Sequence, residues 1–160
     1  MVGVLFDTNI YGRIAEDNEE ISVELVTEIA KDRENFVIHN FKVIRDELRK
    51  APKILNLYDK LTCNTLIPLT KEIDNLAHLY FKEYRKNGGI QGNSNNFMND
   101  LRIVACASIK GFNLVFSDDN KSMHNVIAIK SYQDINLKRN LRTPTFYKYQ
   151  DLKRKYLNSQ

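Results

Sequence analysis

The chain opens with a short, mostly apolar run, residues 2–6, that stops at the carboxylate of Asp7. The run is far shorter than the roughly 18 residues that a membrane span needs, so it is predicted to be a buried strand. In an open α/β sheet, the carboxyl end of a strand points into the crevice where ligands bind. Asp7 is therefore either a functional carboxylate in that crevice or the cap of the following helix. The run alone leaves both interpretations open.

The rest of the chain alternates between strand and helix patterns. Further strands are predicted at 36–39, 65–69, 113–116 and 126–129, with 65–69 at an edge of the sheet because it contains Pro68. Helices are predicted at 10–15, from 17 onward, at 41–50 after an Asn40 cap, at 53–61, after a Thr70 cap, and at 97–110 before Gly111. This alternation predicts a three-layer α/β/α sandwich around a central, mostly parallel sheet.

Charge is distributed unevenly along the 160 residues. Residues 138–160 carry seven basic side chains and one acidic, whereas residues 1–137 carry 17 basic and 19 acidic. We therefore divide the chain into a main domain, 1–137, and a basic, aromatic C-terminal extension, 138–160, with an amphipathic helix predicted at 145–157. Such a segment favours either a polyanionic partner or docking onto the acids of the main domain. The candidate residues for contact with a polyanion such as RNA are Lys138, Arg139, Arg142, Lys153 and Arg154.

The two cysteines, Cys63 and Cys106, match no metal-binding spacing and are expected to be reduced, which favours a cytoplasmic protein. No positively charged leader precedes the first strand, so neither a secretion signal nor membrane association is expected. The three histidines, His39, His78 and His124, also lack a ligand spacing. They are interpreted as structural or surface residues.

Several acids are predicted to meet at one rim of the sheet. Asp7 and the pair Asp118-Asp119 each follow a strand, and Asp100 is expected in the first turn of the helix that leads into the later strand, where the helix dipole favours an ionised carboxylate. Glu47 is expected to lean toward the core from the inner edge of helix 41–50. Carboxylates in one crevice repel each other, so either some are protonated or a divalent cation neutralises them. Oxygen ligands favour Mg²⁺ or Mn²⁺, which would activate a water and stabilise charge on a phosphodiester.

Four segments of the sequence together resemble the PIN domain, the nuclease fold of VapC-type toxins. They are Val4 to Asn9 (VLFDTN), Asp46 to Leu48 (DEL), Asn99 to Ala107 (NDLRIVACA) and Leu114 to Asp119 (LVFSDD). The resemblance covers roughly residues 1 to 130 and implies Mg²⁺- or Mn²⁺-dependent cleavage of RNA. It also implies a homodimer and a small antitoxin partner that blocks the acidic groove.

The resemblance assigns the site residues by position. Asp7, Glu47, Asp100 and Asp119 would be catalytic and hold the metal, with Asp118 as the alternative to Asp119 because adjacent side chains diverge. Thr8 and Ser117 would orient waters or carboxylates, and Asn9 would hold the loop after the first strand.

Three competing interpretations were weighed. A phosphatase with an aspartyl nucleophile commonly needs a second Asp two residues later, where this chain has Asn9. A PIN nuclease of RNA processing, using the basic extension as its RNA anchor, remains open as an alternative to the toxin. A catalytically inactive RNA-binding module also remains open, although the presence of all four acids counts against it.

Overall fold

The computed structural model describes residues 1–157 and contains a single five-stranded parallel sheet. The strands are β1 (Val2–Phe6), β2 (Phe36–Phe41), β3 (Thr62–Ile67), β4 (Leu114–Phe116) and β5 (Thr145–Tyr147). The helices are α1 (Thr8–Glu16), α2 (Glu19–Lys31), α3 (Lys42–Leu48), α4 (Pro52–Leu61), α5 (Lys71–Lys86), α6 (Asn95–Lys110), α7 (Val126–Lys138) and α8 (Tyr149–Leu157). The predicted α/β class and its parallel sheet are confirmed.

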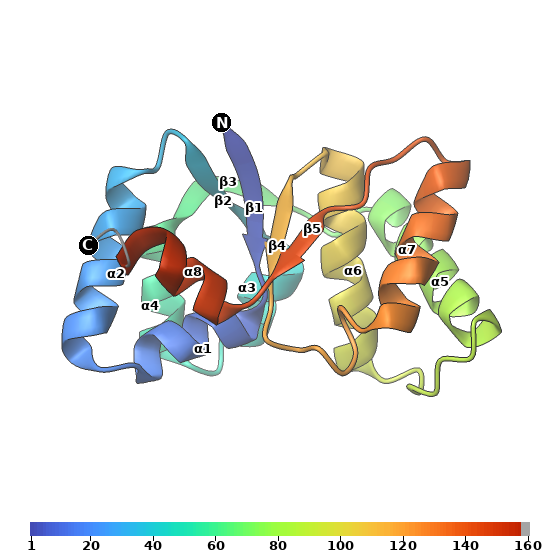
Figure 1. Cartoon of the computed structure of the whole chain (residues 1–160), viewed down its shortest axis with the longest axis horizontal. Helices are drawn as coiled ribbons and strands as arrows, with labels where there is room; N and C mark the ends of the chain where they lie inside the picture. The colour runs from blue at the N-terminus through green and yellow to red at the C-terminus, as the bar shows by residue number, and fades with distance from the viewer. Residues whose placement is uncertain (158–160) are drawn as a thin grey trace.

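The helices cover both faces of the sheet. Figure 1 shows α1, α2, α4 and α8 on one side and α5, α6 and α7 on the other. The central strand β1 is buried between these layers, as its residues Val4, Leu5 and Phe6 are completely inaccessible to solvent. Burial from both sides explains why β1 is apolar without alternation.

The strand order, β3-β2-β1-β4-β5, determines where a site can form. The chain first moves from β1 outward through β2 to β3, which confirms the predicted edge position of the strand beside Pro68, and then returns to the other side of β1 with β4. Right-handed crossovers in opposite directions place the intervening helices on opposite faces. In this architecture the usual position of a ligand site is at such a reversal, here at the carboxyl ends of β1 and β4.

Two predictions for the last third of the chain are wrong. Residues 126–129 begin the helix α7, because the Asn125 side chain caps it and Ala128 and Tyr132 are buried one turn apart. Residues 145–147 form the edge strand β5 and pair with Leu114 to Phe116, so only the remainder of the predicted helix 145–157 is helical, as α8. A β-branched run such as Val126-Ile127 favours a strand locally, but tertiary packing overrides that preference.

The predicted helix boundaries have mixed outcomes. The predicted Thr70 cap of α5 is confirmed, because its side chain accepts a hydrogen bond from the Ile73 backbone. The predicted end of α6 at Gly111 is also confirmed, and this glycine adopts the left-handed conformation with φ 72°. Asn40 is not a cap, because it lies within β2 and its side-chain oxygen accepts a 2.7 Å hydrogen bond from the hydroxyl of buried Tyr58. A buried side-chain amide needs a hydrogen-bond partner, and Tyr58 supplies one for Asn40 in the core.

The C-terminal segment packs against the rest of the protein. Tyr149 and Leu152 of α8 are buried, and the Tyr156 hydroxyl donates a 2.7 Å hydrogen bond to Asp32 at the end of α2. Residues 158–160 of the predicted extension lie outside the described part of the chain. Among residues 1–157, no helix has the length and hydropathy required to cross a membrane.

Candidate acidic site

Asp7 lies at the carboxyl end of β1 and is only 3% exposed. Its Oδ1 accepts a 2.8 Å hydrogen bond from the Thr8 backbone and one from the Thr8 hydroxyl, so Asp7 does cap α1. Its Oδ2 accepts from the Ser117 hydroxyl at 2.8 Å and from the Asn9 amide at 3.2 Å. The two interpretations of Asp7 are therefore compatible, because one oxygen caps the helix and the other faces β4.

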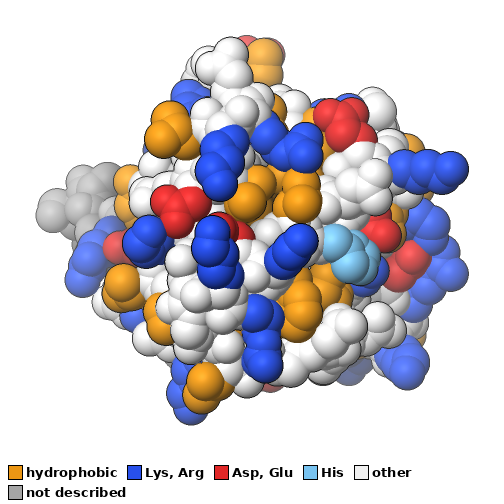
Figure 2. Space-filling model, turned by 90° about the vertical axis from the view of Figure 1, so that its right-hand side faces the viewer, with side chains coloured by type: hydrophobic (Ala, Val, Ile, Leu, Met, Phe, Trp, Pro, Cys, Tyr) orange, Lys and Arg blue, Asp and Glu red, His pale blue; other side chains and the backbone are white. Residues whose placement is uncertain are grey.

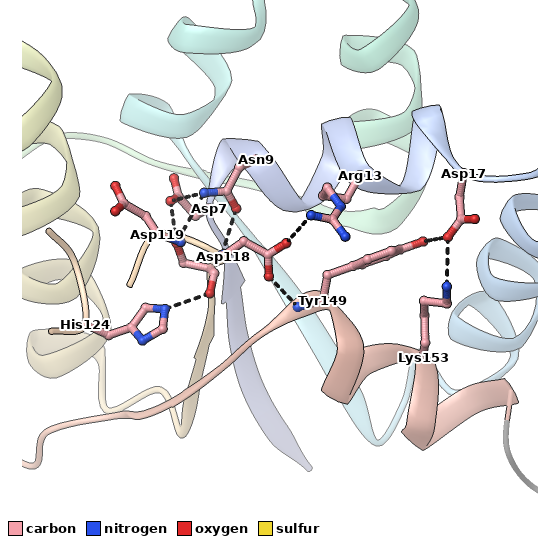
Figure 3. Close-up of polar contacts among 10 residues, drawn as sticks. Asp7, Asn9, Arg13, Asp17, Asp118, Asp119, His124, Tyr149 and Lys153 are labelled. Carbon is pink, nitrogen blue, oxygen red and sulfur yellow. Dashed lines mark hydrogen bonds and ion pairs between the residues drawn. The ribbon is translucent and has the colours of Figure 1, made fainter. Parts of the chain in front are cut away.

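Asn9 and Ser117 join the ends of β1 and β4. The Asn9 amide donates to Ser117 Oγ, and its oxygen accepts from the Asp118 backbone at 3.1 Å (Figure 3). The Ser117 hydroxyl, which is fully buried, also accepts a 3.0 Å hydrogen bond from the Asp119 backbone. These contacts fix the loop that carries Asp119 relative to Asp7.

Asp119 and Asp100 are bridged by a residue that sequence reasoning missed. The Ser122 hydroxyl lies 2.6 Å from Asp119 Oδ2 and 2.9 Å from Asp100 Oδ2. Asp119 Oδ1 accepts from the Ser122 backbone, so the side chain also closes a tight turn. A hydroxyl carries one proton and cannot donate to two carboxylates at once. The hydroxyl therefore donates to the two carboxylates in turn, unless one carboxyl group is protonated and donates to Ser122.

The surroundings of Asp100 favour its protonated form. Burial and the charge of Asp7 raise the pKa of Asp100 to about 8, although its hydrogen bond with Ser122 opposes the shift. The expectation that a helix dipole keeps it ionised is wrong, because α6 starts at Asn95 and Asp100 falls beyond the first turn. The pKa of Asp7 is also raised, chiefly by burial, while hydrogen bonds from Ser117 and Thr8 counteract that effect.

Glu47 lies at the rim of the site. Its side chain is exposed, contrary to the prediction that it leans toward the core. Partial loss of hydration and the charge of Asp7 raise the pKa of Glu47 to about 7. Glu47 lines a surface cavity of about 450 Å³ between α3 and the start of α6. The other lining residues are Val43, Asp46, Lys50, Leu69, Asn96 and Asn99.

Asp118 points away from the acidic cluster. Its Oδ2 forms a 3.0 Å ion pair with Arg13, and its Oδ1 accepts a 2.8 Å hydrogen bond from the Tyr149 backbone. Figure 3 shows this carboxylate directed toward α1 and α8, on the far side from Asp119. The geometry therefore favours Asp119 over Asp118 as the member of the cluster.

The cluster of Asp7, Glu47, Asp100 and Asp119 is electrostatically uncompensated. Within residues 1–157, none of the four forms a salt bridge with a basic side chain. In the same part of the chain, no group of three or more acidic, His or Cys side chains is arranged to hold a metal ion as it stands. The donor set nevertheless fits a hard divalent cation, because it consists of mutually repelling carboxylates with no basic partner.

The five candidate RNA-binding residues do not lie on one surface. Lys138 and Arg139 end α7, and the Arg142 side chain donates to the Gly111 carbonyl just before β4, at the amino end of the strands. Lys153 and Arg154 lie on α8, which starts beside Asp118 at the carboxyl end. Only the second group belongs to a helix that starts at the edge of the sheet that carries the acids, and this helix runs back from that edge to Asp32.

The histidines are structural or surface groups, as expected. His39 stacks on Phe112 with ring centroids 3.9 Å apart, and exposed His78 lies beside Asp74 on α5. His124 lies nearer the site, with Nε2 2.8 Å from the Ser117 carbonyl oxygen (Figure 3). Cys63 and Cys106 are both free thiols.

The fold is PIN-like, as comparison with solved structures shows. The chain resembles the crystal structures of VapBC2 from Rickettsia felis bound to a DNA fragment from its promoter, of DNA-bound VapBC from Salmonella typhimurium, and of FitAcB from Neisseria gonorrhoeae. The TM-scores are 0.55, 0.56 and 0.52 at 16%, 12% and 16% identity. The matches cover 91%, 93% and 89% of this chain and 98%, 99% and 96% of the others. Neither protein-family models nor curated proteins give a match to the sequence.

Proposed function

We propose that this protein is a Mg²⁺- or Mn²⁺-dependent endoribonuclease and the toxin of a toxin–antitoxin pair. The observation that carries the proposal is the convergence of four carboxylates from four separate segments without a basic partner. Burial raises the pKa of Asp7 and Asp100, so the site is unfavourable when empty and fully ionised. A protein retains such a cluster at a cost in stability when the charge has a function.

Asp7, Glu47, Asp100 and Asp119 would hold the cation. A bound dication supplies positive charge that stabilises a phosphodiester under attack and lowers the pKa of a water molecule. The chain contributes orientation: Ser117 and Asn9 fix one oxygen of Asp7, and Ser122 holds the carboxylates of Asp119 and Asp100 together. When Asp100 loses its proton, both carboxylates are ionised and the Ser122 hydroxyl donates to only one of them at a time.

The partners of the protein are proposed from the same likeness. The similar structures are VapBC and FitAcB assemblies, so an antitoxin partner is proposed for this chain, together with a homodimer and RNA as the substrate. The free thiols fit a cytoplasmic location. A small reading frame beside the gene would favour the toxin over an RNA-processing nuclease.

The direct test is RNA cleavage by the purified full-length protein. Cleavage is expected with millimolar Mg²⁺ or Mn²⁺, to cease when a chelator removes the metal, and to return when the metal is restored. The measurement is the rate of appearance of RNA fragments on a gel. Equal cleavage with and without chelator would contradict a metal-dependent site, and no cleavage of any RNA with either metal would favour the inactive binding module.

Ser122→Ala is expected to weaken Mn²⁺ binding about tenfold to a hundredfold, the usual effect of removing a group that orients metal ligands. The substitution deletes the hydroxyl that holds Asp119 and Asp100 together. The measurement is Mn²⁺ affinity by calorimetry. Ser131→Ala is the matched control, because Ser131 is also buried and hydrogen-bonded, to the Ile127 carbonyl, outside the site. Equal Mn²⁺ affinity in both variants would exclude this role for Ser122.

Positive charge is spread over more of the surface than the extension alone. Figure 2 shows the side of the molecule formed by α5 and α7, where many Lys and Arg side chains surround scattered apolar groups. The helix α5 carries Lys82, Arg85 and Lys86, and α7 ends at Lys138 and Arg139. Basic side chains of the main domain are therefore present on the surface in addition to those of the extension. Proximity to the acids is a better guide to RNA contacts than position in the sequence.

We expect the double variant Lys153→Ala, Arg154→Ala to bind single-stranded RNA more weakly, because both side chains belong to the helix that starts at the site edge. Loss of two phosphate contacts lowers the slope of log K against log salt by about 1.4. The measurement is RNA affinity by fluorescence anisotropy across a salt series. Lys138→Ala, Arg139→Ala removes the same charge at the opposite edge and is expected to leave the slope unchanged. A larger effect from this second pair would place the RNA over α7.

A further inference from the structure

The carboxylate of Asp118 joins the C-terminal segment to the loop that carries Asp119. One oxygen accepts from the Tyr149 backbone at 2.8 Å, at the first residue of α8, and the other pairs with Arg13 of α1 at 3.0 Å. Figure 3 shows the side chain spanning from the loop to both helices. Asp118 therefore contacts α1 and α8 directly, while the next residue in the chain faces the acidic cluster.

The same loop has a second connection to the C-terminal segment through its backbone. The Ser117 amide donates a 2.8 Å hydrogen bond to the carbonyl of Tyr147 at the end of β5. The Ser117 hydroxyl in turn accepts from the Asp119 amide, and the Asp118 amide donates to Asn9. The backbone from 117 to 119 is thus held by β5, α8 and the start of α1.

Tyr149 anchors α8 to α1 independently of Asp118. Its hydroxyl donates a 2.6 Å hydrogen bond to Asp17, which also pairs with Lys153 at 3.2 Å. The Arg13 guanidinium lies 5.3 Å from the centre of the Tyr149 ring. Asp17 holds α8 with one hydrogen bond and one ion pair, whereas Asp118 holds α8 with one hydrogen bond and pairs with Arg13 of α1. Of these two residues, only Asp118 belongs to the site loop.

We propose that Asp118 is a positioning residue that uses the docked α8 to set the position of Asp119 in the acidic cluster. Both its oxygens are occupied away from the cluster, so its contribution is through the backbone it shares with Asp119 and not through a ligand. The C-terminal segment lies outside the four segments that resemble the PIN domain. It thereby contributes to the position of a site residue. An effect of Asp118 on catalysis rests on the proposed nuclease function. An effect of Asp118 on the position of the loop that carries Asp119 does not depend on that function.

The test compares Asp118→Ala with Asp17→Ala in the full-length protein. Asp17→Ala removes one hydrogen bond and one ion pair from the docking of α8, and Asp118→Ala removes one hydrogen bond from it together with the ion pair to Arg13 of α1. Asp17→Ala is therefore expected to loosen α8 at least as much as Asp118→Ala does. Asp118→Ala is expected to accelerate hydrogen exchange of the Asp119 and Ser122 amides at least about tenfold, whereas Asp17→Ala changes it less than about twofold. Mn²⁺ affinity is expected to fall about tenfold or more in Asp118→Ala only, as when a group that orients metal ligands is removed.

Asp118→Asn is the conservative variant, because its amide oxygen can still accept from the Tyr149 backbone. The Asp119 and Ser122 amides are expected to exchange more slowly in this variant than in Asp118→Ala. If Asp118→Ala does not fold, Asp118→Asn is compared with Asp17→Asn. Equal exchange in the Asp118 and Asp17 variants would overturn the proposal and reduce Asp118 to a docking contact. If the wild type neither binds Mn²⁺ nor cleaves RNA, the proposed function fails, while the exchange measured without metal still decides the role of Asp118.

Discussion

The Asp7→Asn variant is expected to lose metal-dependent RNA cleavage by at least about a hundredfold. The substitution removes the most buried carboxylate of the cluster, and charge stabilisation by a bound dication is worth several kcal/mol, where each 1.4 kcal/mol is tenfold in rate. The metal-free fold is expected to be as stable as the wild type or more so. Asparagine can still cap α1, and it removes a buried charge that repels Asp119.

The measurements are the cleavage rate and the free energy of unfolding in urea without metal. Asp46→Asn is the matched control, because Asp46 is an exposed acid of α3 that pairs with Lys42 and Arg49 outside the cluster. This control is expected to cleave RNA at the wild-type rate. Normal cleavage by Asp7→Asn would show that the chemistry occurs elsewhere, even if the protein is a nuclease.

Without divalent cations, the protein is expected to lose stability as the pH rises from about 5 to 8. The folded pKa values of Asp100, about 8, and Glu47, about 7, lie above the ordinary values of 3.8 and 4.5. For each group, at a pH between its ordinary pKa and its folded pKa, the folded state binds more protons than the unfolded state. The free energy of unfolding therefore decreases with rising pH in that range. Exposed Glu47 is well screened and contributes little. The free energy of unfolding is expected to fall by about 2–4 kcal/mol, and Asp100 accounts for most of this loss. One proton can contribute at most about 1.36 kcal/mol per pH unit.

Mg²⁺ or Mn²⁺ is expected to reverse this loss. A cation at about 100 times its Kd stabilises the folded state by about 2.7 kcal/mol, and the gain is larger at pH 8 than at pH 5 because the ligands must be deprotonated. The measurement is the melting temperature at several pH values with and without metal. Asp100→Asn is expected to flatten the metal-free profile. A wild-type melting temperature that is independent of both pH and metal would contradict the acidic site.

Most of the architecture follows from local patterns in the sequence. The apolar run before Asp7 predicts β1. Thr70 and Gly111 mark helix ends, because capping depends on hydrogen bonds between residues that are close in sequence. The last third is predicted less well. Val126-Ile127 has strand propensity but lies in a helix, whereas the short β5 is defined only by its pairing with β4. A three-residue edge strand carries almost no local signal.

The residue types of the candidate site, and the strand ends that present them, follow from the order of the amino acids, because a parallel sheet aligns the carboxyl ends of its strands. Tertiary structure alone decided how each acid behaves. It buried Asp7, raised the pKa of Asp100, left Glu47 exposed at the rim and turned Asp118 toward α8. It also brought Ser122 between two carboxylates. Burial and charge–charge interaction depend on distances between segments remote in sequence, so no local pattern encodes them.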